Sequence, residues 1–255
     1  MKKKNFSDLF FFSLILPVIL IVIWELACRQ GMVNTTILPS PGRILGSLVR
    51  QITGGGLQKN IAASLRRVLF GYSAGAVLGI VLGTLMGLFP PFEKSMRFLI
   101  EILRPVPIIA WVPVLILWSG IGERSKIIVI AIGTFWSVLI NVMDGIRHVD
   151  KKYIEVSTLF MKSRMNVIMK VVLPAASPGI FTGLRIGVGT AWISVIGAEM
   201  IAASSGLGFF ISYSRELAQP ANMLVGVFTI GVIGWAINRF LRFAESRLLR
   251  WNVNA

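Results

Sequence analysis

Long apolar stretches alternate with short polar segments along most of the chain. Each stretch is close to the ~20 residues that an α-helix needs to cross the hydrocarbon core of a bilayer. The pattern predicts an all-α, polytopic membrane protein with about six transmembrane helices, folded as a single transmembrane domain over residues 1–255. The predicted spans are 10–27, 68–88, 98–120, 127–146, 175–201 and 223–240.

Two of these spans have an unusual composition. A glycine recurs at every fourth position from Gly75 to Gly87, and such a stripe allows another helix to approach closely. The span 98–120 contains three prolines, which remove helix hydrogen bonds and kink the helix. By contrast, the segment 202–219 is rich in Ser and Gly, and we expect it to form a loop.

The longest polar segment in the second half of the chain is 147–174, between two apolar spans. It is too polar to lie in hydrocarbon, yet apolar and small side chains recur in it at helical spacing. We predict a short helix outside the membrane that places one face against a partner. The residues that define this face are Tyr153, Ile154, Ser157, Phe160 and Met161.

The net charge of +15 comes from basic residues dispersed between the apolar stretches, not gathered on one soluble face. This distribution argues against nucleic-acid binding, whereas basic residues that flank membrane spans are ordinary. With six spans and a cytoplasmic N-terminus, fifteen Lys and Arg lie on the cytoplasmic side and nine on the other, Arg67 and Lys126 among the nine. The bias predicts that both termini and the 147–174 segment are cytoplasmic.

The first apolar stretch follows Lys2, Lys3 and Lys4, which is how a secretory signal peptide begins. No small-x-small cleavage pattern follows it, and the stretch is long for a signal peptide. We therefore expect an uncleaved first span.

Catalytic and metal-binding chemistry has little support in the sequence. The chain has one cysteine, Cys28, and one histidine, His148, far apart, so neither a disulfide nor a Cys/His metal site is expected. A phosphate-binding loop that ends in Gly-Lys-Ser/Thr is also missing, so we do not expect this chain to hydrolyse ATP. We expect a protein that is not an enzyme and needs no cofactor.

The segment 147–174 carries a family resemblance. Glu155-Val156-Ser157, with Leu173-Pro174 ending nineteen residues after the Glu, resembles the Glu-Ala-Ala loop of ABC-importer membrane subunits. In that family the loop forms a coupling helix that docks on the ATPase subunit. The chain departs from the pattern at the two Ala positions and at the family Gly position, which is Met161.

Further motifs resemble the permeases of aliphatic sulfonate, taurine and nitrate importers: Leu38-Pro39-Ser40-Pro41, Arg104-Pro105-Val106-Pro107, Trp118-Ser119-Gly120-Ile121-Gly122, Thr182-Gly183-Leu184-Arg185 and Ser204-Ser205-Gly206-Leu207-Gly208. The resemblance covers about residues 15–251. It implies the type I ABC importer (MetI-like) permease fold in the bacterial inner membrane. It also implies two ATPase subunits, a periplasmic or lipid-anchored substrate-binding protein and a second permease copy as a homodimer.

The substrate class stays open at this point. The resemblance favours a small anion: an aliphatic sulfonate, taurine or nitrate. The same machinery could import a pyrimidine vitamin precursor or another small organic compound. A transporter from another class, working without an ATPase, should show internal repeats and ion ligands at mid-membrane depth, and the sequence shows no clear repeat.

Two groups of residues are candidates for function. The resemblance places Glu155, which would meet a basic residue of the ATPase, at the coupling surface, together with Val156, Ser157, Met161, Leu173 and Pro174. Arginines are costly within a span unless they face a cavity or a partner. The candidates for the translocation pathway are Arg104, Arg185, Thr190, Ser194 and Glu199.

Each pathway candidate also has a structural alternative. Arg104 and Arg185 could attract an anion, or could instead reach the membrane surface or form structural ion pairs, Arg104 with Glu101 for example. Glu199 could belong to a gate or contact the binding protein, or lie in an ordinary loop.

Overall fold

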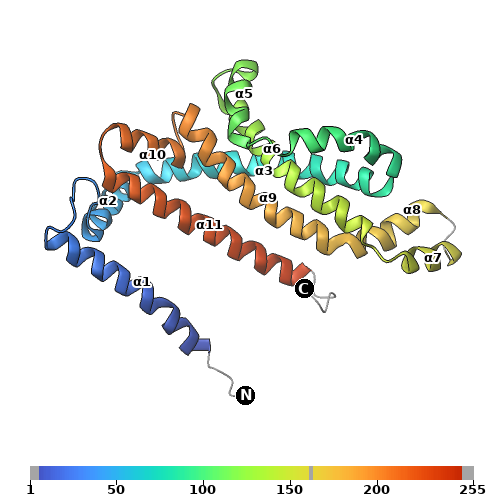
Figure 1. Cartoon of the computed structure of the whole chain (residues 1–255), viewed down its shortest axis with the longest axis horizontal. Helices are drawn as coiled ribbons and strands as arrows, with labels where there is room; N and C mark the ends of the chain where they lie inside the picture. The colour runs from blue at the N-terminus through green and yellow to red at the C-terminus, as the bar shows by residue number, and fades with distance from the viewer. Residues whose placement is uncertain (1–5, 161–162, 249–255) are drawn as a thin grey trace.

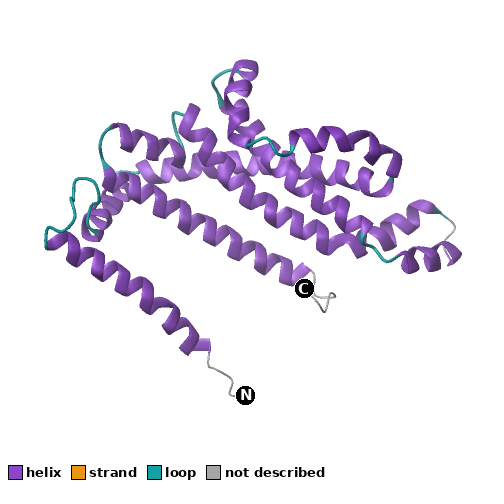
Figure 2. Ribbon diagram, viewed as in Figure 1, coloured by secondary structure: helices purple, strands orange, loops and turns teal. Residues whose placement is uncertain are grey.

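The computed structural model of the chain describes residues 6–160 and 163–248. Within these residues the secondary structure is helical, with no strand, in agreement with the all-α prediction (Figure 2). The helices in chain order are α1 (Phe6–Arg29), α2 (Pro41–Thr53), α3 (Gly56–Leu88), α4 (Pro90–Leu103), the 3-10 turn η1 (Ile108–Ala110), α5 (Trp111–Ser119), α6 (Glu123–Arg147), α7 (Lys151–Phe160), α8 (Arg164–Val167), the π-helical η2 (Ile168–Val172), α9 (Leu173–Ala202), α10 (Leu207–Glu216) and α11 (Pro220–Leu248).

Most of the predicted spans correspond to long apolar helices. In the described part, four helical segments are long and apolar enough to cross a membrane: α3, α6, the continuous segment Arg164–Ala202, and α11. The bent pair of helical segments Pro90–Leu103 and Ile108–Ser119 adds a fifth if the pair forms one span. The first predicted span, 10–27, lies in α1, which is 24 residues long. α1 is not one of the four candidate spans named above.

The third predicted span is a broken helix. Pro90–Leu103 and Ile108–Ser119 meet at an angle of 81°. The break contains Pro105 and Pro107, which cannot donate backbone hydrogen bonds, so the helix ends before them and restarts after a 3-10 turn. The prolines indicated a kink, but the structure has a sharp change of direction.

Three tilted helices, α3, α6 and α9, form the centre of the molecule (Figure 1). The glycine stripe of α3 faces α6: a Cβ atom added at Gly75 would lie 2.4 Å from the carbonyl oxygen of Ala131, and one at Gly79 would lie 2.8 Å from Val138 Cβ. On the other side of α6, Gly145 meets Gly179 of α9 just as closely. The prediction that this glycine stripe serves close helix packing is confirmed.

Valine at position 75 is therefore expected to disrupt the fold. Overpacking costs about 1–3 kcal/mol when side chains can shift, and here the nearest atom belongs to the backbone. Gly75→Val should lower both the yield of monodisperse protein in detergent and the midpoint of thermal unfolding. Gly231→Val on α11 is the matched control, because a Cβ there has no neighbour within 4 Å. Equal behaviour of the two variants would contradict the role of the stripe.

Different connecting segments lie at the two ends of the central helices α6 and α9. The polar segment with α7 and α8 joins α6 to α9 at one end, whereas α10 follows α9 at the other end (Figure 1). The segment 202–219, predicted as a loop, therefore contains a ten-residue helix. Before the second span lies α2, and Ser40 caps its N-terminus by accepting a hydrogen bond from Arg43 N.

Candidate functional site

The segment between α6 and α9 contains the predicted helix. α7 spans Lys151–Phe160, and the Asp150 carboxylate accepts a hydrogen bond from Lys152 N in its first turn (2.9 Å). Glu155, Val156 and Ser157 lie in the middle of this helix. Met161, at the family Gly position, lies outside the described residues.

The apolar surface of α7 is unusually exposed. The side chains concerned are Tyr153 (62% exposed), Val156 (54%), Leu159 (83%) and Phe160 (84%). Within the described part α7 packs mainly against α8 and η2, which are short. An apolar helix surface of this kind outside the spans indicates a protein interface.

The rest of the segment is firmly attached to the central helices. Val149, Val167 and Val172 are buried in a cluster with side chains of α3, α6 and α9. Leu173 and Pro174 are the first residues of α9, which continues directly from the π-helical η2. The residues on both sides of α7 are therefore joined to α6 and α9 through buried contacts.

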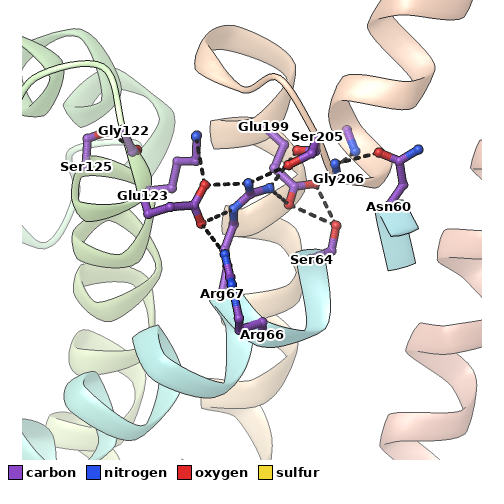
Figure 3. Close-up of polar contacts among 12 residues, drawn as sticks. Asn60, Ser64, Arg66, Arg67, Gly122, Glu123, Ser125, Glu199, Ser205 and Gly206 are labelled. Carbon is purple, nitrogen blue, oxygen red and sulfur yellow. Dashed lines mark hydrogen bonds and ion pairs between the residues drawn. The ribbon is translucent and has the colours of Figure 1, made fainter. Parts of the chain in front are cut away.

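A second polar site lies at the opposite end of the central helices. Arg67 of α3 is 1% exposed and lies between Glu123 of α6 and Glu199 of α9 (Figure 3). We call the group the Arg67 cluster; its members are Asn60, Ser64, Arg67, Glu123, Glu199 and Ser205.

All five N–H donors of Arg67 have acceptors. Nε and Nη2 donate to the two carboxylate oxygens of Glu123 (2.8 and 2.6 Å), and Nη1 donates to Glu199 (2.7 Å). The remaining two bonds go to the carbonyl and hydroxyl oxygens of Ser205 (2.7 and 3.0 Å). Full pairing offsets the large cost of removing a guanidinium from water.

Glu199 is equally well satisfied, although its side chain is 0% exposed. Besides Arg67, its carboxylate accepts hydrogen bonds from Ser64 Oγ (2.8 Å to Oε2) and from Gly208 N (3.0 Å). Gly208 lies in the first turn of α10, where a negative charge is favoured by the helix dipole.

Glu123 differs from Glu199 because its side chain is 43% exposed and has several cationic neighbours. Lys126 reaches it at 3.4 Å and Arg66 at 3.5 Å, in addition to Arg67. Arg67 and Lys126, which the sequence placed in outer loops, lie instead in α3 and α6, and both are buried. The hydropathy pattern places the start of the span at residue 68, whereas α3 begins at Gly56.

One signal in the sequence could have indicated the cluster. Asn60, Ser64 and Arg67 are spaced by four and then three residues, so they share one face of a helix. This regularity precedes the apolar stretch that begins at residue 68, so hydropathy alone does not include it in the span. Of its carboxylate partners, only Glu199 was singled out from the sequence.

Comparison with known proteins identifies the family. Residues 75–250 match the model of the binding-protein-dependent transport system inner membrane component. The chain belongs to this family. It is the membrane-spanning permease subunit of an ABC importer, whose ATPase is a separate subunit.

Three relatives of this permease are named for the transport of aliphatic sulfonates, taurine or nitrate. It is 37% identical over 94% of its length to the putative aliphatic sulfonates transport permease protein SsuC of Bacillus subtilis, covering 87% of that protein. It is 35% identical over 93% of its length to the taurine transport system permease protein TauC of Escherichia coli, covering 88% of it. It is 33% identical over 96% of its length to the nitrate import permease protein NrtB of Synechocystis, covering 93% of it.

Solved structures confirm the fold of this permease. A structure of the MetNI methionine ABC transporter, in an inward-facing conformation, matches 73% of the chain and 93% of its own chain with a TM-score of 0.55 and 19% identity. An amino acid ABC transporter crystallised with histidines matches 78% of the chain and 97% of its own, with a TM-score of 0.66 and 16% identity. The expected MetI-like permease fold is therefore confirmed.

The two candidate arginines of the permease have different surroundings. Arg185 donates to Glu245 of α11 at 2.8 Å, which is the kind of structural pair considered from the sequence. Arg104 is exposed at the end of α4 and has no ion pair within the described residues, so the possible pair with Glu101 does not form there. Their role in the pathway stays a prediction.

The two hydroxyl candidates lie on α9 where it meets α6. Thr190 donates to the carbonyl oxygens of Gly187 and Gly133, at 2.9 and 3.1 Å. Ser194 is 5% exposed and donates to the carbonyl of Thr190 (2.6 Å). Both hydroxyls are thus satisfied by backbone groups in this conformation. No group of three or more metal-binding side chains occurs among the described residues of the permease.

Proposed function

We propose that this permease imports a small anionic solute: an aliphatic sulfonate, taurine or nitrate. The observation that carries the proposal is the similarity, over more than nine-tenths of the chain, to permeases named for these three solutes. The solutes share a compact oxyanion, so a pathway suited to one has chemistry in common with the others.

The proposed assembly holds two copies of the permease, two ATPase subunits and an external substrate-binding protein. α7 is the proposed docking element for the ATPase, with Glu155 as the residue that meets a basic side chain. Its exposed apolar side chains fit the docking of an amphipathic helix into a groove. The basic bias of the loops favours a cytoplasmic position for α7 and for both termini.

In the proposed cycle, ATP binding closes the two ATPase subunits and moves α7. The central helices follow as rigid elements and change from inward-open to outward-open, which is a two-state change biased by ligand. The binding protein supplies affinity, so the permease needs only weak contact with the solute.

Arg104 is the proposed anion-attracting residue. It is exposed and unpaired in the described part, whereas Arg185 is already engaged by Glu245. We expect Arg104→Gln to reduce uptake several-fold at low solute concentration, with Arg43→Gln on α2 as the control. Normal uptake by Arg104→Gln would contradict this role and indicate that Arg104 is a structural residue.

The substrate class is tested by ATPase activity in lipid discs. The permease, its ATPase and its binding protein are co-assembled, and an alkanesulfonate, taurine, nitrate and an uncharged pyrimidine are titrated separately. We expect stimulation by at least one anion and none by the pyrimidine. Stimulation by the pyrimidine alone would refute the anion proposal and leave the family assignment unchanged.

A further inference from the structure

The Arg67 cluster adds polar contacts between helices that also pack against one another along their lengths. Arg67 and Ser64 belong to α3, Glu123 to α6 and Glu199 to α9, and the cluster lies at the end of these helices remote from α7 (Figures 1 and 3). The other end of α6 and α9 adjoins the α7 segment. The two helices that receive any movement of α7 are thus tied together again at their far ends.

The cluster also holds the connection between α9 and α10. Three successive backbone N–H groups are bound by cluster side chains: Gly206 N by Asn60 Oδ1 (2.8 Å), Leu207 N by Ser64 Oγ (2.9 Å) and Gly208 N by Glu199 (3.0 Å). Ser205 is bound through its carbonyl by Arg67. Every residue from 205 to 208 therefore has a polar contact with the cluster.

The backbone of this connection is fitted to the buried carboxylate. Gly206 has φ +113°, and a Cβ atom there would lie 2.2 Å from the Glu199 carboxyl carbon. Any other residue would be strained and would also push Glu199 away from Arg67. The connection and the ion pair consequently depend on each other.

From these contacts we propose that Arg67 is a positioning residue for transport, because it makes the far ends of α3, α6 and α9 and the 203–206 connection move as one body. Without it, movement that enters α6 and α9 from α7 would separate their far ends instead of carrying the connection with them. The inference needs the ABC-importer assembly but does not depend on which solute is imported.

Spin-label distances test this directly. In a Cys28→Ala background, labels are placed at Arg124→Cys on α6 and at Ser204→Cys in the connection, both at exposed positions. The labelled permease is diluted in unlabelled permease and assembled with its ATPase. The 124–204 distance is then measured without nucleotide and in the state trapped with ATP and vanadate. We expect one narrow distribution, the same in both states.

Two variants loosen the cluster in different ways. Arg67→Lys keeps a positive charge but cannot make five bonds in a planar fork. Asn60→Ala/Ser64→Ala frees the N–H groups of Gly206 and Leu207 and keeps every charge. In both variants we expect a broader distribution that shifts by several ångströms between the two states, with the ATPase still bound. Arg66→Met is the control, since Arg66 is 63% exposed and its one ion pair among the described residues is with Glu123. The distance distribution of this variant should stay narrow.

Two results would overturn the inference. One is a 124–204 distance that differs between the two states while Arg67 is intact, or a distance distribution that stays narrow in both loosened variants. The other is loss of assembly in both loosened variants, because the cluster would then serve folding and not movement. If none of the tested solutes stimulated the ATPase, the 124–204 distances would still be as expected here. Failure of the proposed substrate class can therefore be told apart from failure of the proposed role of Arg67.

Discussion

Replacing Glu199 by leucine is expected to cost the permease about 3–5 kcal/mol of stability, which is the usual range when one partner of a buried ion pair is removed. Arg67 would stay buried with one carboxylate instead of two, and Gly208 N and Ser64 Oγ would lose their acceptor. We expect a large fall in the yield of monodisperse protein and in the midpoint of thermal unfolding in detergent.

The double variant Arg67→Met/Glu199→Leu is the matched comparison. It removes both buried charges together, and apolar replacement of a whole pair is often neutral or stabilising. We expect it to recover much of the stability that Glu199→Leu loses. Glu123→Gln should cost less than Glu199→Leu, because the Glu123 side chain is 43% exposed. If Glu199→Leu is as stable as the original protein, the cluster does not stabilise the fold.

Placing aspartate at Leu159 of α7 is expected to abolish co-purification of the ATPase. Leu159 is 83% exposed, so the permease itself should fold normally. In the docked assembly the same position would bury a carboxylate without a partner, and this costs several kcal/mol. A cost of that size weakens binding by a factor of about 100 or more. The measurement is the ratio of ATPase to permease after affinity purification.

Two further variants complete this test. Met32→Asp is the control, because Met32 is 75% exposed in the connection between α1 and α2, far from α7 (Figure 1). It should leave the ratio unchanged. Glu155→Ala should weaken docking less than Leu159→Asp does. A normal ratio for Leu159→Asp, in a folded permease, would show that α7 does not dock the ATPase.

The sequence predicted the helical spans well because they depend on hydropathy alone. It failed where polar residues are helical and buried. The predicted second span begins only at residue 68, because the polar residues of α3 before it find their partners on α6 and α9, more than fifty residues away. Similarly, the prolines of the third span predicted a kink but not the 81° bend, after which α5 packs on α6 while α4 packs on α3.

The two sites were predictable to different degrees. The α7 segment is local, so periodicity and family resemblance were enough to locate its helix. The Arg67 cluster joins side chains from three helices, and nothing in the spacing of Glu123 and Glu199 along the chain shows that one arginine reaches both. Buried charges of this type need the packing of the whole bundle before they can be found.

The central claim is that this permease works with a separate ATPase to drive import. ATP-dependent uptake into proteoliposomes is the most direct test, with permease and ATPase in the membrane, the binding protein outside and ATP inside. Labelled taurine or nitrate should accumulate only when both the ATPase and ATP are present. Equal accumulation by the permease alone would contradict the account and indicate a transporter that works without an ATPase.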